Sequence, residues 1–222
     1  MNLLAVEASS ENISLCIKYR GKVISDFNRK IQFGASLLIQ QIDWELRKNR
    51  IKLKEIDAFV VGQGPGSFTG LRISFSLIKA FMLATQKPAI MVGSFFSCAE
   101  RLKKDSNKIA VISDARRNLI YAASFKVKDG ALKKEAKEKL CLLEEFISTK
   151  KDYLFVSYDR NLRDKSLVLE PKLNFYSKDI YPSAGHLLLQ AELCYNKGNF
   201  TPIEKLKPLY LHPKTCQIRK NK

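Results

Sequence analysis

The start of the chain alternates between apolar and polar positions in a way that predicts antiparallel strands. Residues 3–8 form an apolar run, residues 13–19 alternate, and residues 23–31 follow the turn Arg20-Gly21-Lys22. A period of two puts every second side chain on the same face of a strand. We therefore expect the chain to open as a meander.

A helix is expected over residues 36–49, and it carries a broad apolar surface. Its core-facing positions, at helical spacing, are Leu38, Ile42 and Leu46. Its other edge carries Leu37, Gln41 and Trp44, the only tryptophan of the chain. A stripe this wide either faces a large core or contacts a partner helix, and tryptophan is a residue type that anchors such contacts.

A second helix, over residues 71–84, is apolar on every side. One side carries Leu71, Phe75, Ile78 and Met82, and another carries Leu77, Phe81 and Ala84. A helix of this kind is either covered by its own protein or packed on a second subunit. We expect a partner interface formed by Leu37, Gln41, Trp44, Leu71, Phe75, Ile78 and Met82.

The rest of the chain alternates between strands and helices and then becomes less regular. The segments predicted are strands at 89–92, 109–113 and 119–127, a helix at 95–103, a helix at 142–149, a strand at 153–157, an irregular stretch at 159–178 and a helix at 183–195. A meander followed by this alternation indicates an α/β protein with mixed sheets flanked by helices. We expect two lobes, residues 1–103 and a smaller lobe of residues 104–222.

Composition indicates an ordinary globular protein of 222 residues, with 45% hydrophobic and 27% charged residues. The amino terminus lacks the features of a signal peptide, so we expect a soluble cytoplasmic protein that does not associate with a membrane. The five cysteines occur singly, as do His186 and His212. This spacing predicts free thiols and neither metal nor cofactor.

The charge balance of 39 Lys and Arg against 22 Asp and Glu gives a net charge of +17. Such a charge favours binding to polyanions. The basic residues are, however, spread along the whole chain, which is equally consistent with lysines that only keep the surface solvated. The densest groups lie at residues 133–139 and in the tail from Lys214. Contact with nucleic acid is one of the two interpretations that remain open.

The most informative local feature is a glycine-rich turn between a strand and the second helix. The turn, residues 62–70, reads Gly-Gln-Gly-Pro-Gly-Ser-Phe-Thr-Gly. It matches neither the dinucleotide fingerprint nor the P-loop, and it is not a nucleophile elbow. Its glycines serve either a tight crossover or phosphate binding. The candidate nucleotide or phosphate contacts are Glu7, Gly64, Gly66, Ser67 and Thr69.

The string Gly-Pro-Gly-Ser-Phe-Thr-Gly-Leu-Arg over residues 64–72 resembles the signature of the TsaB family, a subunit of the bacterial machinery that makes threonylcarbamoyladenosine in tRNA. Shorter segments elsewhere support the resemblance. They are Ala5-Val6-Glu7-Ala8-Ser9-Ser10, Ser113-Asp114-Ala115-Arg116-Arg117, Tyr121-Ala122-Ala123 and Pro208-Leu209-Tyr210-Leu211.

The resemblance implies a two-lobed, ribonuclease H-like fold of the actin, sugar-kinase and heat-shock ATPase superfamily. It also implies a non-catalytic scaffold subunit that pairs through its first two helices with a TsaD-like enzyme, which threonylcarbamoylates the adenosine next to the anticodon of tRNA. A TsaE-like ATPase is the further partner implied. The same surface can hold a second copy of the chain when the partner is absent.

The alternative function is an independent ATPase or kinase of the same superfamily that uses the Gly62–Gly70 turn. Gly64, Gly66, Ser67 and Thr69 would then contact phosphate, and Glu7 or Asp114 would hold magnesium. Two departures from the superfamily pattern argue against hydrolysis. Glu7 stands where an aspartate is usual, and Gln63 replaces an arginine that is often present in the turn.

Overall fold

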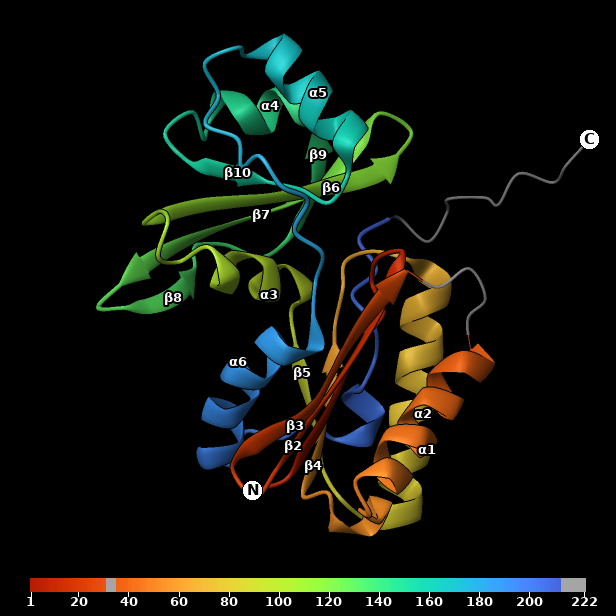
Figure 1. Cartoon of the computed structure of the whole chain (residues 1–222). Coiled ribbons are helices and arrows are strands. Elements are labelled where there is room, and N and C mark those ends of the chain that lie inside the picture. The colour runs from red at the N-terminus through yellow and green to blue at the C-terminus, as the bar shows by residue number, and fades with distance from the viewer. Residues whose placement is uncertain (31–34, 213–222) are drawn as a thin grey trace, which may run out of the picture.

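A computed structural model describes residues 1–30 and 35–212 and shows two lobes, each built on a five-stranded mixed sheet (Figure 1). The strands of the first sheet are β1 (Leu3–Glu7), β2 (Asn12–Tyr19), β3 (Lys22–Lys30), β4 (Ala58–Gly62) and β5 (Ala89–Val92). Their order is β3-β2-β1-β4-β5, with β1, β4 and β5 parallel and the meander β1-β2-β3 antiparallel. This is the ribonuclease H-like arrangement, so the predicted fold class is confirmed.

Helices cover both faces of the first sheet. α1 (Ala35–Lys48) and α2 (Phe68–Thr85) lie side by side on one face, and α6 (Ala184–Asn196) covers the other (Figure 1). The division at residue 104 is wrong for α6, which had been assigned to the second lobe. Its buried residues Ala184, Leu187, Leu188 and Ala191 share a core cluster with Leu3, Ala5 and Val60 of the first sheet.

The second lobe contains the remaining strands and helices. They are α3 (Ser94–Arg101), β6 (Lys108–Arg116), β7 (Leu119–Lys128), β8 (Ala131–Lys134), β9 (Lys139–Leu142), α4 (Leu143–Ser148), β10 (Leu154–Val156) and α5 (Arg160–Leu169). The strand order is β10-β6-β7-β8, and β9 pairs with the first part of β7, whereas β8 pairs with its last part. α3 lies between the two sheets, because Phe95 and Cys98 pack on the second sheet while the helix also contacts α6.

Two short 3-10 helices, Leu53–Glu55 and Ile203–Lys205, complete the described elements. The predicted irregular stretch of residues 159–178 is wrong over α5. Asp159 caps this helix, since its side chain accepts a hydrogen bond from the Leu162 N–H at 3.2 Å. Polar residues interrupt the apolar spacing of α5, and only Leu162 and Ser166 are buried in it.

α2 forms part of the core, which corrects the predicted partner interface. Leu71, Phe75 and Ile78 are only 1%, 3% and 0% exposed, and they belong to the core cluster beneath α1 and α2. Of the described helices, α2 alone is long and apolar enough to span a membrane by length and composition. The burial of one face against the sheet is the pattern of a core helix.

Candidate functional site

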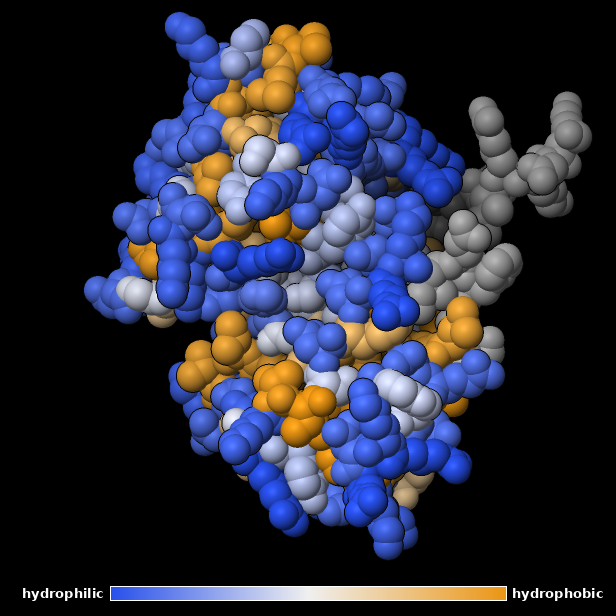
Figure 2. Space-filling model, in the orientation of Figure 1, coloured by the Kyte–Doolittle hydropathy of each residue, from blue (hydrophilic) through white to orange (hydrophobic). Residues whose placement is uncertain are grey.

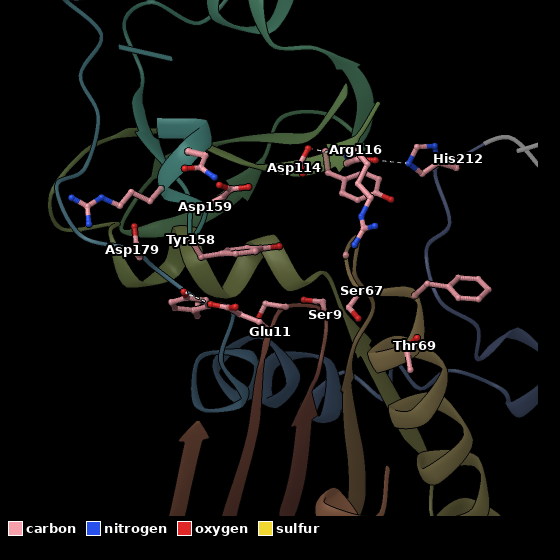
Figure 3. A pocket seen from close by; sticks show the side chains of 18 residues that line it. Ser9, Glu11, Ser67, Thr69, Asp114, Arg116, Tyr158, Asp159, Asp179 and His212 are labelled. Carbon is pink, nitrogen blue, oxygen red and sulfur yellow. Dashed lines mark hydrogen bonds between the residues drawn. The ribbon is translucent and has the colours of Figure 1, made fainter. Parts of the chain in front are cut away.

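A cleft of about 810 Å³ separates the two lobes, and the glycine-rich turn lies at its edge. Its first-lobe wall consists of the β1–β2 turn and the start of α2, and its second-lobe wall consists of the β6–β7 turn and the start of α5 (Figure 3). Among the predicted phosphate contacts, Gly66, Ser67 and Thr69 line the cleft. Glu7 and Gly64 are buried behind this wall.

The backbone amides of the turn already donate hydrogen bonds within the protein. The Gly64 N–H donates to Ser94 Oγ at 2.9 Å, and the Ser67 N–H donates to the Ser9 carbonyl at 2.7 Å. The Gly70 N–H donates to Ser67 Oγ at 3.2 Å, which caps α2. A phosphate cradle depends on amides that point at the ligand. These three amides are therefore used for internal structure.

Two of the glycines allow the β1–β2 turn to approach the start of α2 very closely. A Cβ at Gly66, whose φ is +154°, would lie 2.0 Å from the Ser9 carbonyl oxygen. A Cβ at Gly70 would lie 2.0 Å from the Ala8 carbonyl oxygen. Larger residues cannot occupy these positions unless the backbone moves. The geometry therefore favours the tight-crossover interpretation of the turn.

Glu7 ends β1 as a fully buried carboxylate, 0% exposed. Its Oε1 accepts the Ser9 N–H at 2.6 Å, whereas Oε2 has no hydrogen-bond partner of ordinary geometry. Burial raises the pKa of the Glu7 carboxyl, and the neighbouring hydroxyls of Ser94 and Ser9 offset only part of that effect. Glu7 does not line the cleft, and its carboxyl lies against Gly62, where a Cβ would be 1.9 Å from Oε2, so it is not placed to reach a ligand in the cleft.

Glu7→Gln is expected to make stability less dependent on pH. Since the pKa of Glu7 is raised above its ordinary value of 4.5, the folded chain keeps a proton that the unfolded chain has released. The free energy of unfolding therefore falls as pH rises above that value, until the folded carboxyl also ionises. Urea denaturation at about pH 5 and about pH 8 should show that the free energy of unfolding falls less between the two pH values for the variant than for the parent.

Glu11→Gln is the control, because Lys30 and Tyr181 lower the pKa of Glu11, and its carboxyl is ionised in both states over this range. The fall in stability should be the same for this variant and the parent. Equal falls for the parent and Glu7→Gln would show that Glu7 does not hold a proton in the folded chain.

Aromatic residues line the cleft, and sequence analysis did not identify them. Tyr158 and Tyr181 stack with ring centroids 5.5 Å apart, and Tyr121 meets His212 edge-on at 5.7 Å. His212 Nε2 lies 2.9 Å from the Ala115 carbonyl, so the segment after α6 reaches the second lobe. These residues come from segments far apart in the sequence, and no local pattern connects them.

Charges on the cleft wall have local partners. The Tyr181 hydroxyl donates to Glu11 at 2.7 Å, and Asp114 accepts the Arg116 N–H at 2.8 Å. Residues 1–30 and 35–212 bring no group of three His, Cys, Asp or Glu side chains together that could hold a metal ion. The expectation of a chain without metal stays a prediction.

The predicted partner interface is only partly exposed. Leu37 and Trp44 are 40% and 52% exposed, while Gln41 and Met82 are half-buried. Gln41 donates a hydrogen bond to the buried Glu45 at 3.1 Å. Two further apolar residues of these helices are exposed, Ile39 of α1 at 51% and Leu83 of α2 at 65%.

The basic segment of the second lobe is partly neutralised by acidic neighbours. Lys134 pairs with Glu138 at 2.9 Å, and Glu135 pairs with Lys126 and Lys150. Burial alone would raise the pKa of the Glu135 carboxyl. Lys126, Lys150 and the Tyr153 hydroxyl outweigh burial and lower that pKa to about 2. The other basic group, the tail from Lys214, lies outside the described residues.

A ribonuclease H-like lobe that faces a second α/β lobe across a cleft defines the two-lobed class that includes actin and the sugar kinases. The same fold occurs in YeaZ from Pseudomonas aeruginosa, with a TM-score of 0.82 and 22% identity over 94% of this chain and 100% of that one. A second structure is described as an uncharacterized protein from P. aeruginosa with similarity to peptidase YEAZ. Its TM-score is 0.81, and it is 22% identical over 95% of this chain and 99% of its own.

Sequence comparison gives the family. The family model for TsaD, tRNA N6-adenosine threonylcarbamoyltransferase, matches residues 35–177. The tRNA threonylcarbamoyladenosine biosynthesis protein TsaB of Escherichia coli is 22% identical over 95% of this chain and 94% of its own length. TsaB of Haemophilus influenzae is 29% identical over 54% of the chain, an alignment that spans about half, 52%, of that relative. The chain belongs to the TsaB family of tRNA threonylcarbamoyladenosine biosynthesis proteins.

Proposed function

We propose that the chain is a non-catalytic scaffold subunit that pairs with a TsaD-like enzyme when that enzyme threonylcarbamoylates the adenosine next to the anticodon in tRNA. The observation that carries the proposal is the exposed apolar pair Leu37 and Trp44 of α1, with the half-buried Gln41 beside them. Trp44 is half exposed, although burying its ring would remove a large apolar area from water. Family membership supports the kind of partner.

The shape of the surface around Trp44 fits a partner helix. One hollow of about 410 Å³ beside the ring is lined by α1 alone, from Leu37 to Arg47, and another of about 650 Å³ lies between β3 and α1. The Lys48 Nζ lies 4.6 Å from the centroid of the Trp44 ring and covers part of it. Aromatic residues beside grooves are frequent hot spots of protein interfaces.

The interface proposed here is narrower than the one predicted from the sequence. It consists of Leu37 and Trp44 of α1, which lie on one side of the helix because they are seven residues apart, whereas Leu71, Phe75 and Ile78 are in the core. A specific pair of proteins usually buries about 1,600 Å² in total. A second copy of the chain can occupy the same surface when the partner is absent.

Trp44→Ala is expected to weaken capture of the TsaD homologue about 30-fold, the effect of losing roughly 2 kcal/mol at a hot spot. Affinity is measured by immobilising the full-length TsaD homologue on a surface and titrating the full-length chain over it. Circular dichroism checks that the variant is folded. Leu193→Ala is the control, because Leu193 is 55% exposed on α6, and α6 and α1 cover opposite faces of the first sheet. Figure 2 shows exposed apolar side chains over the α6 region. Unchanged capture by Trp44→Ala would reject this surface.

The remaining partners follow from the same proposal. A TsaE-like ATPase joins the complex, tRNA is the substrate of the complex, and the chain acts in the cytoplasm. The engaged amides of the glycine-rich turn support a scaffold in preference to an independent ATPase or kinase.

A further inference from the structure

Two family-like segments that lie far apart in the sequence meet at the start of α2. Phe68 comes from the glycine-rich turn and Tyr210 from the segment after α6, and their ring centroids are 5.3 Å apart. The contact is fixed by a backbone hydrogen bond from the Leu209 N–H to the Gln63 carbonyl at 2.9 Å. Neither the scaffold function nor the proposed interface uses this pair.

The two rings are tilted by 42°, and a guanidinium group packs on the Phe68 ring of the pair. The Arg72 guanidinium carbon lies 4.1 Å from the centroid of the Phe68 ring. Phe68 and Tyr210 are nevertheless 50% and 47% exposed, whereas Phe59, Phe95 and Phe155 are fully buried. We call Phe68, Arg72 and Tyr210 the α2 platform. Its two rings stay half-exposed to solvent beside the mouth of the cleft, which Phe68 also lines.

The segments that form the α2 platform contribute positive charges, whereas the cleft beside it is also lined by the carboxylates of Glu11, Asp159 and Asp179. α2 contains Arg72 and Lys79 and no carboxylate, and Lys207 is exposed shortly before Tyr210. Figure 3 shows the Arg116 side chain reaching from the β6–β7 turn toward Ser67 at the start of α2. The acidic residue of that turn, Asp114, accepts the Arg116 N–H. Flat faces with cations around them suit a ligand that has both exposed bases and phosphates.

We propose that the α2 platform stacks an unpaired base of the tRNA loop, while Arg116 contacts a neighbouring phosphate. The inference rests on the proposed function for the choice of tRNA. Aromatic rings and guanidinium planes stack bases of any sequence, so the platform adds affinity for single strands without reading the sequence. Double-stranded RNA keeps its bases stacked inside the helix and gains nothing from the platform.

The test measures RNA affinity of the full-length chain, alone and with the TsaD homologue, by fluorescence anisotropy. The probes are an anticodon stem-loop RNA and a fully paired duplex of the same composition. Phe68→Leu and Tyr210→Leu are each expected to weaken stem-loop binding about tenfold and to leave duplex binding unchanged. Tyr210→Phe, which keeps the ring, should retain the affinity of the parent.

Salt dependence separates stacking from charge. Phe68→Leu should leave the slope of log affinity against log salt concentration unchanged, while Arg116→Gln should reduce that slope by about one. Phe200→Leu is the control for a lost ring, since Phe200 is 40% exposed and pairs with Tyr195 away from the platform. It should bind both RNA probes as the parent does.

Two results would overturn the inference. One is parent-like stem-loop affinity in folded Phe68→Leu and Tyr210→Leu. The other is that these two variants lose capture of a protein partner while they bind RNA as the parent does, which would make the platform a protein interface. Failure of the proposed function has a different signature, namely no capture of the TsaD homologue by the parent chain.

Discussion

Phe75→Ala is expected to lower the free energy of unfolding by about 3–5 kcal/mol. Phe75 is 3% exposed and belongs to the core cluster that also contains Leu4, Phe59 and Ile78. Truncation removes the transfer free energy of the ring and leaves a cavity, because packed neighbours relax only in part. Urea denaturation followed by circular dichroism measures the loss.

Leu83→Ala is the matched control on the same helix, because Leu83 is 65% exposed. Its expected effect on stability is within about 0.5 kcal/mol. If Phe75→Ala unfolded at the same urea concentration as the parent, the burial of this face of α2 would be refuted. Phe75 would then return to the candidates for direct contact with a partner.

The fold was predictable from the sequence to a large extent, because alternating and helical spacings mark core faces. The meander β1-β2-β3 and the helices α1 and α2 were predicted with ends close to those observed. Placement in space was less accurate. α6 was assigned to the wrong lobe, since apolar residues such as Leu187 and Leu188 show that a helix is buried but not which sheet covers it.

The interface prediction shows a similar limit. Spacing put Leu71, Phe75 and Ile78 on one side of α2 correctly, but a helix with apolar residues all round does not reveal which side meets the sheet. For α1 the distinction succeeded, because Leu38 and Ile42 are buried while Trp44 is exposed.

Candidate chemistry was predictable only where it is local in the sequence. The glycine-rich turn was identified as a strand-to-helix crossover, and its glycines do lie at such a crossover. The stacked Tyr158 and Tyr181 and the Phe68–Tyr210 pair depend on contacts between distant segments. Such contacts are determined by the tertiary fold, so the two members of each pair carry no shared local signal.

Gly70→Ala is expected to destabilise the protein by about 3 kcal/mol, the upper part of the range for overpacking. Helix propensity alone predicts the opposite sign, because alanine is the better helix former by about 1 kcal/mol. The Cβ would lie 2.0 Å from the Ala8 carbonyl oxygen, so the β1–β2 turn would have to move away from α2. Urea denaturation of parent and variant measures the difference.

Gly185→Ala is the control, since Gly185 also lies in the first turn of a helix, α6. Its Cβ would meet only the end of the Asp26 side chain, 3.1 Å away, and that exposed side chain can rotate. The control should therefore be neutral or slightly stabilising. A loss of stability in Gly70→Ala alone indicates that the glycine is needed for close packing. If the parent chain bound nucleotide and Gly70→Ala lost that binding with its stability unchanged, the turn would instead be a phosphate site. The independent ATPase or kinase would then replace the scaffold as the better account of the turn.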